Sequence, residues 1–149
     1  MIIKSIKSLF LRDLNRLKKE ISLYSSEDNL WLVDKEITNS SGNLCYHLIG
    51  NLKHFIGSQL GNTGYIRQRD LEFSAKNIPI KELQEGIDQT IEIIDSTLSK
   101  LSDEDLQLDY PLIVFKDKMT VGYFLIHLNS HINYHLGQIN YHRRLLDNS

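Results

Sequence analysis

Two histidines four residues apart, His131 and His135, lie in a stretch with helical periodicity that covers residues 119–146. On a helix their side chains lie one turn apart, about 6 Å along the axis, so both imidazoles can face one metal ion. His127 lies one turn upstream, and His127 with His131 is an equally well-spaced pair. His127 and His135 are about 12 Å apart along the axis, whereas metal–nitrogen bonds are about 2 Å long. We therefore expect one pair to bind an ion together with a third ligand from another helix.

A second stretch with helical periodicity, residues 44–60, contains the candidates for that third ligand. His47, Asn51 and His54 lie beside its apolar positions with spacings of four and three, so they face inward or nearly so. A cluster of buried imidazoles without partners would be unfavourable, and a bound metal ion would give their nitrogens a partner. The spacing alone leaves His47 and His54 as alternatives.

Several catalytic motifs are absent from the sequence, which narrows the chemistry. The pair on the last helix lacks the glutamate of His-Glu-x-x-His, so it has no general base of the metalloprotease kind. No Glu-x-x-His occurs, which argues against a carboxylate-bridged di-iron bundle. There is no phosphate-binding Gly-x-x-x-x-Gly-Lys-Ser/Thr loop and no Gly-x-Ser-x-Gly nucleophile motif. A three-histidine site with open positions remains, and it suits Lewis-acid activation of water, a thiol or a carbonyl.

The composition predicts one globular domain over residues 1–149, with 41% hydrophobic residues and a formal net charge of −2. No window has the roughly 18 uncharged apolar residues of a membrane span, and the first residues do not form a secretory signal. One cysteine, Cys45, cannot form an internal disulfide, which fits a reducing compartment. The basic residues of the first helix fall between its apolar positions and predict a solvated face. We therefore expect a cytoplasmic protein without nucleic-acid or membrane partners.

Four stretches with helical periodicity predict an all-α fold, specifically an up-and-down four-helix bundle. These stretches are residues 3–24, 44–60, 79–102 and 119–146. A charged loop, residues 65–74, precedes the third stretch. The long connection between the third and fourth stretches, residues 103–118, contains two apolar runs that fit a β-hairpin or a packed lid.

The histidine-bearing segments resemble a known family. Residues 45–56 (Cys-Tyr-His-Leu-Ile-Gly-Asn-Leu-Lys-His-Phe-Ile) and 131–144 (His-Ile-Asn-Tyr-His-Leu-Gly-Gln-Ile-Asn-Tyr-His-Arg-Arg) are similar to the DinB/YfiT-like superfamily of metal-binding four-helix proteins. Within it, the chain most resembles a bacterial group of unassigned function with a loop like residues 67–74. The resemblance implies that His47, His131 and His135 are the ligands of a nickel or zinc ion. It also implies a homodimer.

The resemblance further implies a function, because characterised relatives include enzymes that use low-molecular-weight bacterial thiols such as bacillithiol or mycothiol. We expect a thiol S-transferase with a small-molecule substrate, in which the ion takes the thiol and lowers its pKa. A metal-dependent hydrolase is the alternative, with His54 or His127 as candidate general bases. A non-catalytic, stress-related protein that binds a metal or a ligand is a third hypothesis.

Polar side chains near the expected ligands are candidates for contact with the thiol or substrate. Asn51 and Gln138 each lie about one turn beyond a ligand, where packing amides are an equal alternative. Arg67 and Arg69 are candidates for binding a carboxylate of the thiol, against the alternative of salt bridges with Asp70 or Glu72.

Cys45 is two residues before His47 and points to a different helix face. We therefore expect it to be a small packing residue rather than a ligand or a nucleophile.

Overall fold

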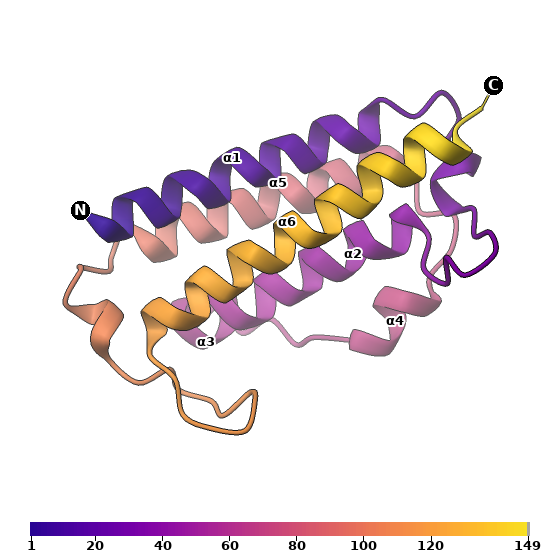
Figure 1. Ribbon diagram of the computed structural model, residues 1–149. Coiled ribbons are helices and arrows are strands. Elements are labelled where there is room, and N and C mark those ends of the chain that lie inside the picture. Colours follow the sequence, from indigo (N-terminus) through magenta and orange to yellow (C-terminus); the bar gives the residue numbers. More distant parts are fainter. Residues whose placement is uncertain (149) are drawn as a thin grey trace.

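The computed structural model describes residues 1–148 of the protein and consists of helices joined by loops (Figure 1). The long helices are α1 (Ile2–Ser22), α2 (Ser41–Leu52), α5 (Ile80–Leu98) and α6 (Val121–Leu146). The shorter elements are 3₁₀-helices η1 (Glu27–Trp31) and η3 (Asp105–Gln107), π-helix η2 (Lys53–Ser58), and helices α3 (Gln59–Gly61) and α4 (Arg69–Ser74). No strand forms within residues 1–148, so the predicted all-α class is confirmed. No helix in that part of the chain is long and apolar enough to cross a membrane.

The apolar residues that recur with helical spacing in the sequence are buried and form the hydrophobic core. The buried stripe of α1 consists of Ile3, Ile6, Phe10, Leu14, Leu17 and Ile21. Helix starts also follow from local chemistry, because Ser40 and Thr120 accept hydrogen bonds from the backbone N–H groups of Asn43 and Tyr123. The predicted end of the second helical stretch is confirmed at Asn62, whose backbone is left-handed with φ of 51°.

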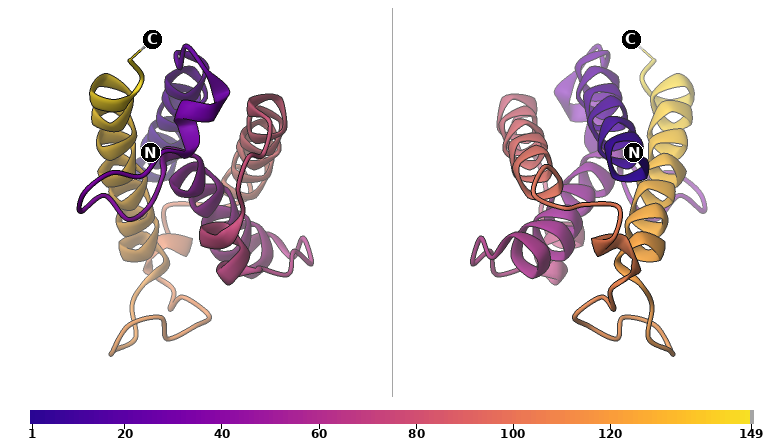
Figure 2. Two further views of the ribbon diagram at one scale, coloured as in Figure 1. Left: turned by 90° about the vertical axis from the view of Figure 1, so that its right-hand side faces the viewer. Right: turned by 90° about the vertical axis from the view of Figure 1, so that its left-hand side faces the viewer.

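Helices α2 and α5 run in the same direction. Three contacts follow one another along α5 and along α2 with its continuation η2. Ile49 lies beside Gly86, Lys53 donates a hydrogen bond to Gln89, and Gly57 lies beside Ile93. The residue numbers increase together from one contact to the next, so the two helices are parallel. Figure 2 shows α5 and α2 on one side of the molecule and α6 on the other.

This parallel pair corrects the predicted up-and-down connectivity. Helix α1 is antiparallel to α5, because Lys7 pairs with Asp95 and Lys18 pairs with Asp88. The directions along the chain are therefore up, down, down and up. Residues 62–79 allow this order because they return along α2 before α5 begins (Figure 1), whereas a short loop would leave α2 and α5 antiparallel.

Two connecting segments also differ from expectation. The predicted β-hairpin does not form within the described residues, where the connection to α6 has only an isolated bridge between Asp109 and Thr120. Beyond the bridge, Leu112 and Ile113 are exposed, so no buried face holds two strands together. The charged stretch 65–74 is not entirely a loop, because α4 forms over its second half. Six residues are too few to show helical periodicity in a sequence.

A buried carboxylate joins α1 to α6. Asp13 has no exposed surface, and its Oδ2 accepts hydrogen bonds from the amide groups of Asn129 (3.1 Å) and Asn133 (2.8 Å). Arg12 donates to its Oδ1 at 2.8 Å. Burial would raise the pKa of Asp13, but the hydrogen bonds from Arg12 and the two asparagines outweigh this and lower it. Asp13 therefore stays ionised and holds the two helices in register.

Replacement of Asp13 by alanine should lower the free energy of unfolding by about 2–4 kcal/mol, because two asparagine amides lose their acceptor. Urea denaturation followed by circular dichroism measures this loss. Asp95→Ala is the matched control, since it removes an exposed carboxylate and should cost less than about 1 kcal/mol. Equal losses in the two variants would contradict the role of Asp13.

A chain of hydrogen bonds closes the end of the molecule where α6 finishes. Nε2 of His142 lies 2.9 Å from the carbonyl oxygen of Leu32, so Nε2 carries the proton and donates it. Nδ1 then accepts from the hydroxyl of Tyr24 at 2.7 Å, and the Ser41 hydroxyl completes the chain at 2.8 Å from Tyr24. Burial lowers the pKa of His142, which keeps the ring in this neutral form.

We predict that the free energy of unfolding falls as the pH drops below about 6.5, the pKa of histidine in an unfolded chain. His142 has a lower pKa when folded, so between the two values the unfolded chain binds more protons and is favoured by acid. Urea denaturation at several pH values between 7.5 and 5, with a chelator present, measures this slope. His142→Gln should have a shallower slope, and an unchanged slope would contradict the assignment.

Candidate metal centre

Helices α2 and α6 pack against each other and bring three histidines together. His47 comes from α2, and His131 and His135 come from successive turns of α6. Nε2 of His131 lies 3.3 Å from Nε2 of His47 and 3.0 Å from Nε2 of His135. One nitrogen from each ring lies within 4.8 Å of the other two, so this group could hold a metal ion.

The nitrogen separations match those of ligands that share one ion. Two nitrogens about 2.05 Å from a tetrahedral ion are about 3.3 Å from each other. The observed separations of 3.3 and 3.0 Å are close to this value. Three protein ligands leave a fourth tetrahedral position for water or substrate, as in catalytic rather than structural zinc sites.

Glu72 of α4 sets the orientation of His47. Its Oε1 lies 2.9 Å from Nδ1 of His47, and the residue is only 2% exposed. Because an ionised carboxylate can only accept, Nδ1 of His47 carries the proton and Nε2 keeps its lone pair. Carboxylates in this position orient a metal-binding histidine and make it a better ligand.

Arg67 and Gly50 hold Glu72 in place. Two nitrogens of Arg67 donate to the two carboxylate oxygens of Glu72, each at 2.9 Å. Burial would raise the pKa of Glu72, but the hydrogen bonds from His47 and Arg67 outweigh it and lower the pKa. A Cβ at position 50 would lie 2.1 Å from Oε2 of Glu72, so glycine leaves the space for the carboxylate.

The two histidines of α6 have different surroundings. Nδ1 of His135 donates to Oε1 of Gln138 at 2.7 Å, so Nε2 of His135 also keeps its lone pair. Nδ1 of His131 is buried and has no hydrogen-bond partner within residues 1–148. Without an ion, Nε2 of His131 can donate at most one proton, although it faces the lone pairs of two atoms, Nε2 of His47 and Nε2 of His135. A cation held by the three rings would satisfy all three Nε2 atoms at once.

The surroundings keep the α6 histidines neutral. Burial, and then the nearby His135 and His47, lower the pKa of His131 to about 4. Burial also lowers the pKa of His135, against the opposing effect of its hydrogen bond to Gln138. Neutral imidazole is the form that binds metal ions, so the cluster is ready for a cation at neutral pH.

Two cavities adjoin the cluster. A smaller cavity of about 240 Å³ is lined by His47, His131, Asn51 and Arg67, among others, and by an aromatic wall. The members of this wall are Phe55, Phe115, Phe124 and His127. A larger cavity of about 490 Å³ is lined by His135 and Gln138 together with residues 36–39 and the last turns of α6. Side chains of the cluster therefore line two separate cavities, His47 and His131 the smaller one and His135 the larger one.

The structure separates the histidines that the spacing left as alternatives. His47 belongs to the cluster, whereas His54 lies two turns further along, about 10 Å away on the axis. His127 also lies outside the cluster and stacks on Phe124 with an angle of 7° between the rings. Cys45 is fully buried, which raises the pKa of its thiol to about 12 and fits the predicted packing role.

The four other residues that the sequence analysis proposed as contacts of the thiol or substrate line one or the other of the two cavities. Arg67, Arg69 and Asn51 line the smaller cavity, and Gln138 lines the larger one. Arg67 forms the salt bridge with Glu72 that was one of its two alternatives. Arg69 forms no salt bridge within residues 1–148 and lies 5.3 Å from the ring centre of Phe73. Oδ1 of Asn51 is buried and has no hydrogen-bond partner within the same residues.

Sequence reasoning missed Glu72 as the partner of His47. The contact depends on where α4 docks, and no local spacing encodes that position. One signal was present in Gly50, a glycine three residues after His47 and inside a helix. Glycine there costs about 1 kcal/mol relative to alanine, so it indicates a close approach by another group.

The fold and the site together define an all-helical protein with a possible three-histidine metal site. The chain belongs to the family described as "Protein of unknown function (DUF1572)", which it matches over residues 2–149. No curated protein matches the chain. Membership of the DinB/YfiT-like superfamily stays a prediction.

Replacement of Glu72 by glutamine should weaken zinc binding about 10- to 100-fold, as is usual when the carboxylate partner of a metal-binding histidine is lost. Glutamine can still accept the hydrogen bond from Nδ1 of His47, but it lacks the negative charge that makes the ring a better ligand. Competition with a chromogenic zinc chelator measures the Kd.

The control for this measurement is Asp70→Asn, which removes the same charge from an exposed position on α4. It should bind zinc like the wild type, and circular dichroism should show that both variants are folded. If the two variants bind zinc equally well, Glu72 does not orient the ligand.

Proposed function

We propose that the protein binds one divalent metal ion through His47, His131 and His135 and acts as a thiol-dependent S-transferase. The observation that carries this proposal is the convergence of the three Nε2 atoms, with separations of 3.0 and 3.3 Å. Glu72 and Gln138 direct two of these atoms inward as free lone pairs. Zinc and nickel both suit imidazole ligands, and we propose one of them as the ion.

The two cavities support a reaction between two molecules. The larger cavity, about 490 Å³, has the usual volume of a small-molecule site and would take the thiol, with Gln138 at its edge. The smaller cavity, about 240 Å³, would take the reacting end of the electrophile beside Asn51 and Arg67. The sequence analysis expected Arg67 and Arg69 to contact the thiol. In this assignment they would contact the electrophile instead, because they do not line the larger cavity.

The chain's own residues orient and shield the reactants in this proposal. A bound ion would supply the positive charge that lowers the pKa of the thiol. The thiolate sulfur then forms a bond to an electrophilic carbon, the leaving group departs with its electron pair, and the thiol proton passes to solvent. Phe55 and Phe124 would keep water from the carbon, and the unpaired Oδ1 of Asn51 would accept a hydrogen bond from the substrate.

The contacts support a transferase better than a hydrolase. A hydrolase needs a general base that can take a proton from water. No carboxylate is among the described residues that line the smaller cavity, and the nearby Glu72 already accepts hydrogen bonds from Arg67 and His47. His127 is the remaining candidate, but its ring is stacked on Phe124.

We further propose that the long helices form a four-helix bundle of the DinB/YfiT-like kind, with the chain as a single domain. The packing of α2 on both α5 and α6, and of α1 on the same two helices, supports this architecture. We also propose a homodimer through the outer face of α6. Tyr134 and Tyr141 are two turns apart on that face, and they are 66% and 62% exposed.

Protein purified without a polyhistidine tag should contain about one zinc or nickel ion per chain. Mass spectrometry of the metal content should show that His47→Ala, His131→Ala and His135→Ala each lose it, because two imidazoles alone bind more weakly. His127→Ala is the matched control, since it removes an imidazole of α6 that lies outside the cluster. Absence of metal from the wild type after reconstitution would contradict the proposal.

The metal-loaded wild type should also consume 1-chloro-2,4-dinitrobenzene in the presence of bacillithiol, mycothiol or glutathione. His131→Ala should react only at the uncatalysed rate, and His54→Ala, which removes an imidazole outside the cluster and outside the described lining of both cavities, should keep the activity. If the metal is bound but none of the three thiols supports turnover, the transferase is rejected and metal binding is retained.

A further inference from the structure

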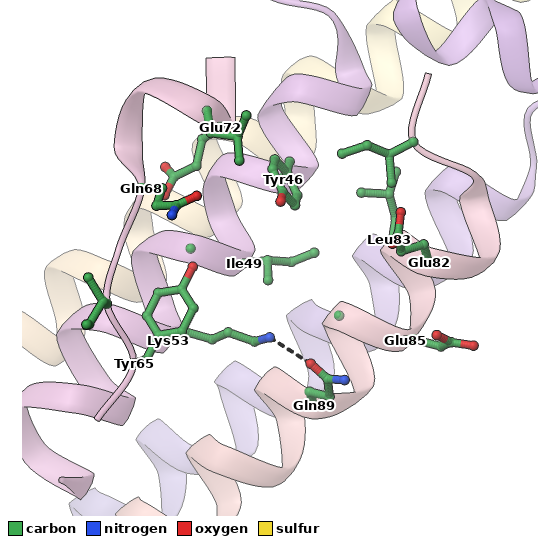
Figure 3. A pocket seen from close by; sticks show the side chains of 15 residues that line it. Tyr46, Ile49, Lys53, Tyr65, Gln68, Glu72, Glu82, Leu83, Glu85 and Gln89 are labelled. Atoms are coloured by element: carbon green, nitrogen blue, oxygen red, sulfur yellow. Dashed lines mark hydrogen bonds between the residues drawn. The ribbon is translucent and has the colours of Figure 1, made fainter. Parts of the chain in front are cut away.

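A third cavity, of about 430 Å³, lies between α2, α5, α4 and residues 65–68. None of the three clustered histidines lines it, and its volume is within the usual range for small-molecule sites. Its apolar side is formed by Ile49 and Leu83, which are 5% and 1% exposed. Figure 3 shows Tyr65, Lys53 and Gln89 at one end of the space and Tyr46 and Gln68 at the other.

Lys53 is the positively charged residue of this cavity. Its ammonium group donates to Oε1 of Gln89 at 2.7 Å and lies 5.8 Å from the ring centre of Tyr65. Figure 3 shows the side chain passing beneath Tyr65 toward α5, whereas a surface lysine usually extends into solvent. Burial lowers the pKa of Lys53, as expected for an ammonium group that has lost part of its hydration.

Within the described part of the chain, residues 1–148, the ammonium group of Lys53 forms no salt bridge. Its one hydrogen bond within residues 1–148 goes to the neutral amide of Gln89. Partly buried charges in proteins are usually paired with an opposite charge. An ammonium group has three N–H donors, so two remain for an anion that enters the cavity. Lys53 is also the first residue of π-helix η2, and such interruptions of an α-helix occur frequently at functional sites.

The acidic residues at the rim limit the charge that the cavity can accept. Glu72 also lines the cavity, but its carboxylate is paired with Arg67 and His47. Glu82 and Glu85 line the α5 side of the cavity and are exposed. Figure 3 shows the carboxylate of Glu85 turned away from Lys53, so it does not neutralise the ammonium group. These two carboxylates would repel a doubly charged phosphate more strongly than a singly charged carboxylate. The buried side chains of Ile49 and Leu83 favour a hydrocarbon body behind that group.

We propose that this cavity is a binding site for a small aliphatic monocarboxylic acid. The carboxylate binds to the ammonium group of Lys53, and the hydrocarbon body lies against Ile49 and Leu83. Gly86 allows the side chain of Ile49 to lie against the α5 backbone, since a Cβ there would come within 3.0 Å of Ile49 Cδ1. This site is separate from the metal cluster and does not depend on the proposed transferase activity.

The test is a titration of the full-length, zinc-loaded protein with 4-methylpentanoate, followed by calorimetry and by amide chemical shifts in NMR. The amide signals of Lys53, Gly86 and Gln89 should shift. The uncharged 4-methylpentanamide should bind at least about tenfold more weakly, because it cannot form charge-assisted hydrogen bonds. Inorganic phosphate should not saturate the site at millimolar concentrations.

Substitutions then assign the binding to Lys53. Lys53→Met should lose at least about tenfold in affinity, and Gln89→Ala should weaken binding several-fold because the ammonium group is no longer held inward. Lys81→Met is the matched control, since it removes the same charge from an exposed position of α5 outside the cavity. His131→Ala should bind the acid like the wild type, which separates this site from carboxylate binding at a metal ion.

Three results would overturn the proposal. The first is equal affinity for the acid and its amide. The second is unchanged affinity in Lys53→Met. The third is a set of shifts confined to Asn51, Phe55 and His127, which would locate the acid in the smaller cavity beside the histidines.

Discussion

The hydrogen bond between Glu72 and His47 connects the fold to the candidate metal centre. A carboxylate that is only 2% exposed has lost nearly all of its hydration, and it stays ionised only because His47 and Arg67 both donate to it. Its charge in turn decides which nitrogen of His47 carries the proton. The lone pair that faces His131 is therefore set by a residue of another helix, α4, and not by the histidine spacing.

The parallel arrangement of α2 and α5 makes this contact possible. Parallel neighbours need a connection that returns the chain to the starting end, and residues 62–79 provide it. Arg67 and Glu72 both lie on this returning segment, which passes along α2 beside His47. A short loop between the two helices would have carried neither residue to the site. The topology and the orientation of His47 thus depend on the same segment.

Local patterns predicted the helices well, and long-range contacts were harder to predict. The stripe from Ile3 to Ile21 and the cap at Thr120 follow from neighbouring residues, so the sequence was sufficient for them. Helical periodicity is the same whichever way a helix points, so it could not reveal that α2 and α5 are parallel.

The candidate site was predictable to a similar extent. The His131 and His135 pair follows from helical spacing, whereas the choice of His47 over His54 came from a family resemblance. Glu72 was missed because its contact with His47 depends on where α4 docks, and Gly50 was the one local signal of that contact.

Gly50 of α2 affects both the candidate metal centre and the cavity that contains Lys53. On one face, the carboxylate of Glu72 passes over Gly50 to reach His47, and a Cβ there would lie 2.1 Å from Oε2. Gly50 and Glu72 also line the cavity that contains Lys53. A side chain at position 50 would therefore push Glu72 away from His47 or into that cavity. The helix accepts the unfavourable conformational entropy of an internal glycine because no other residue leaves both spaces intact.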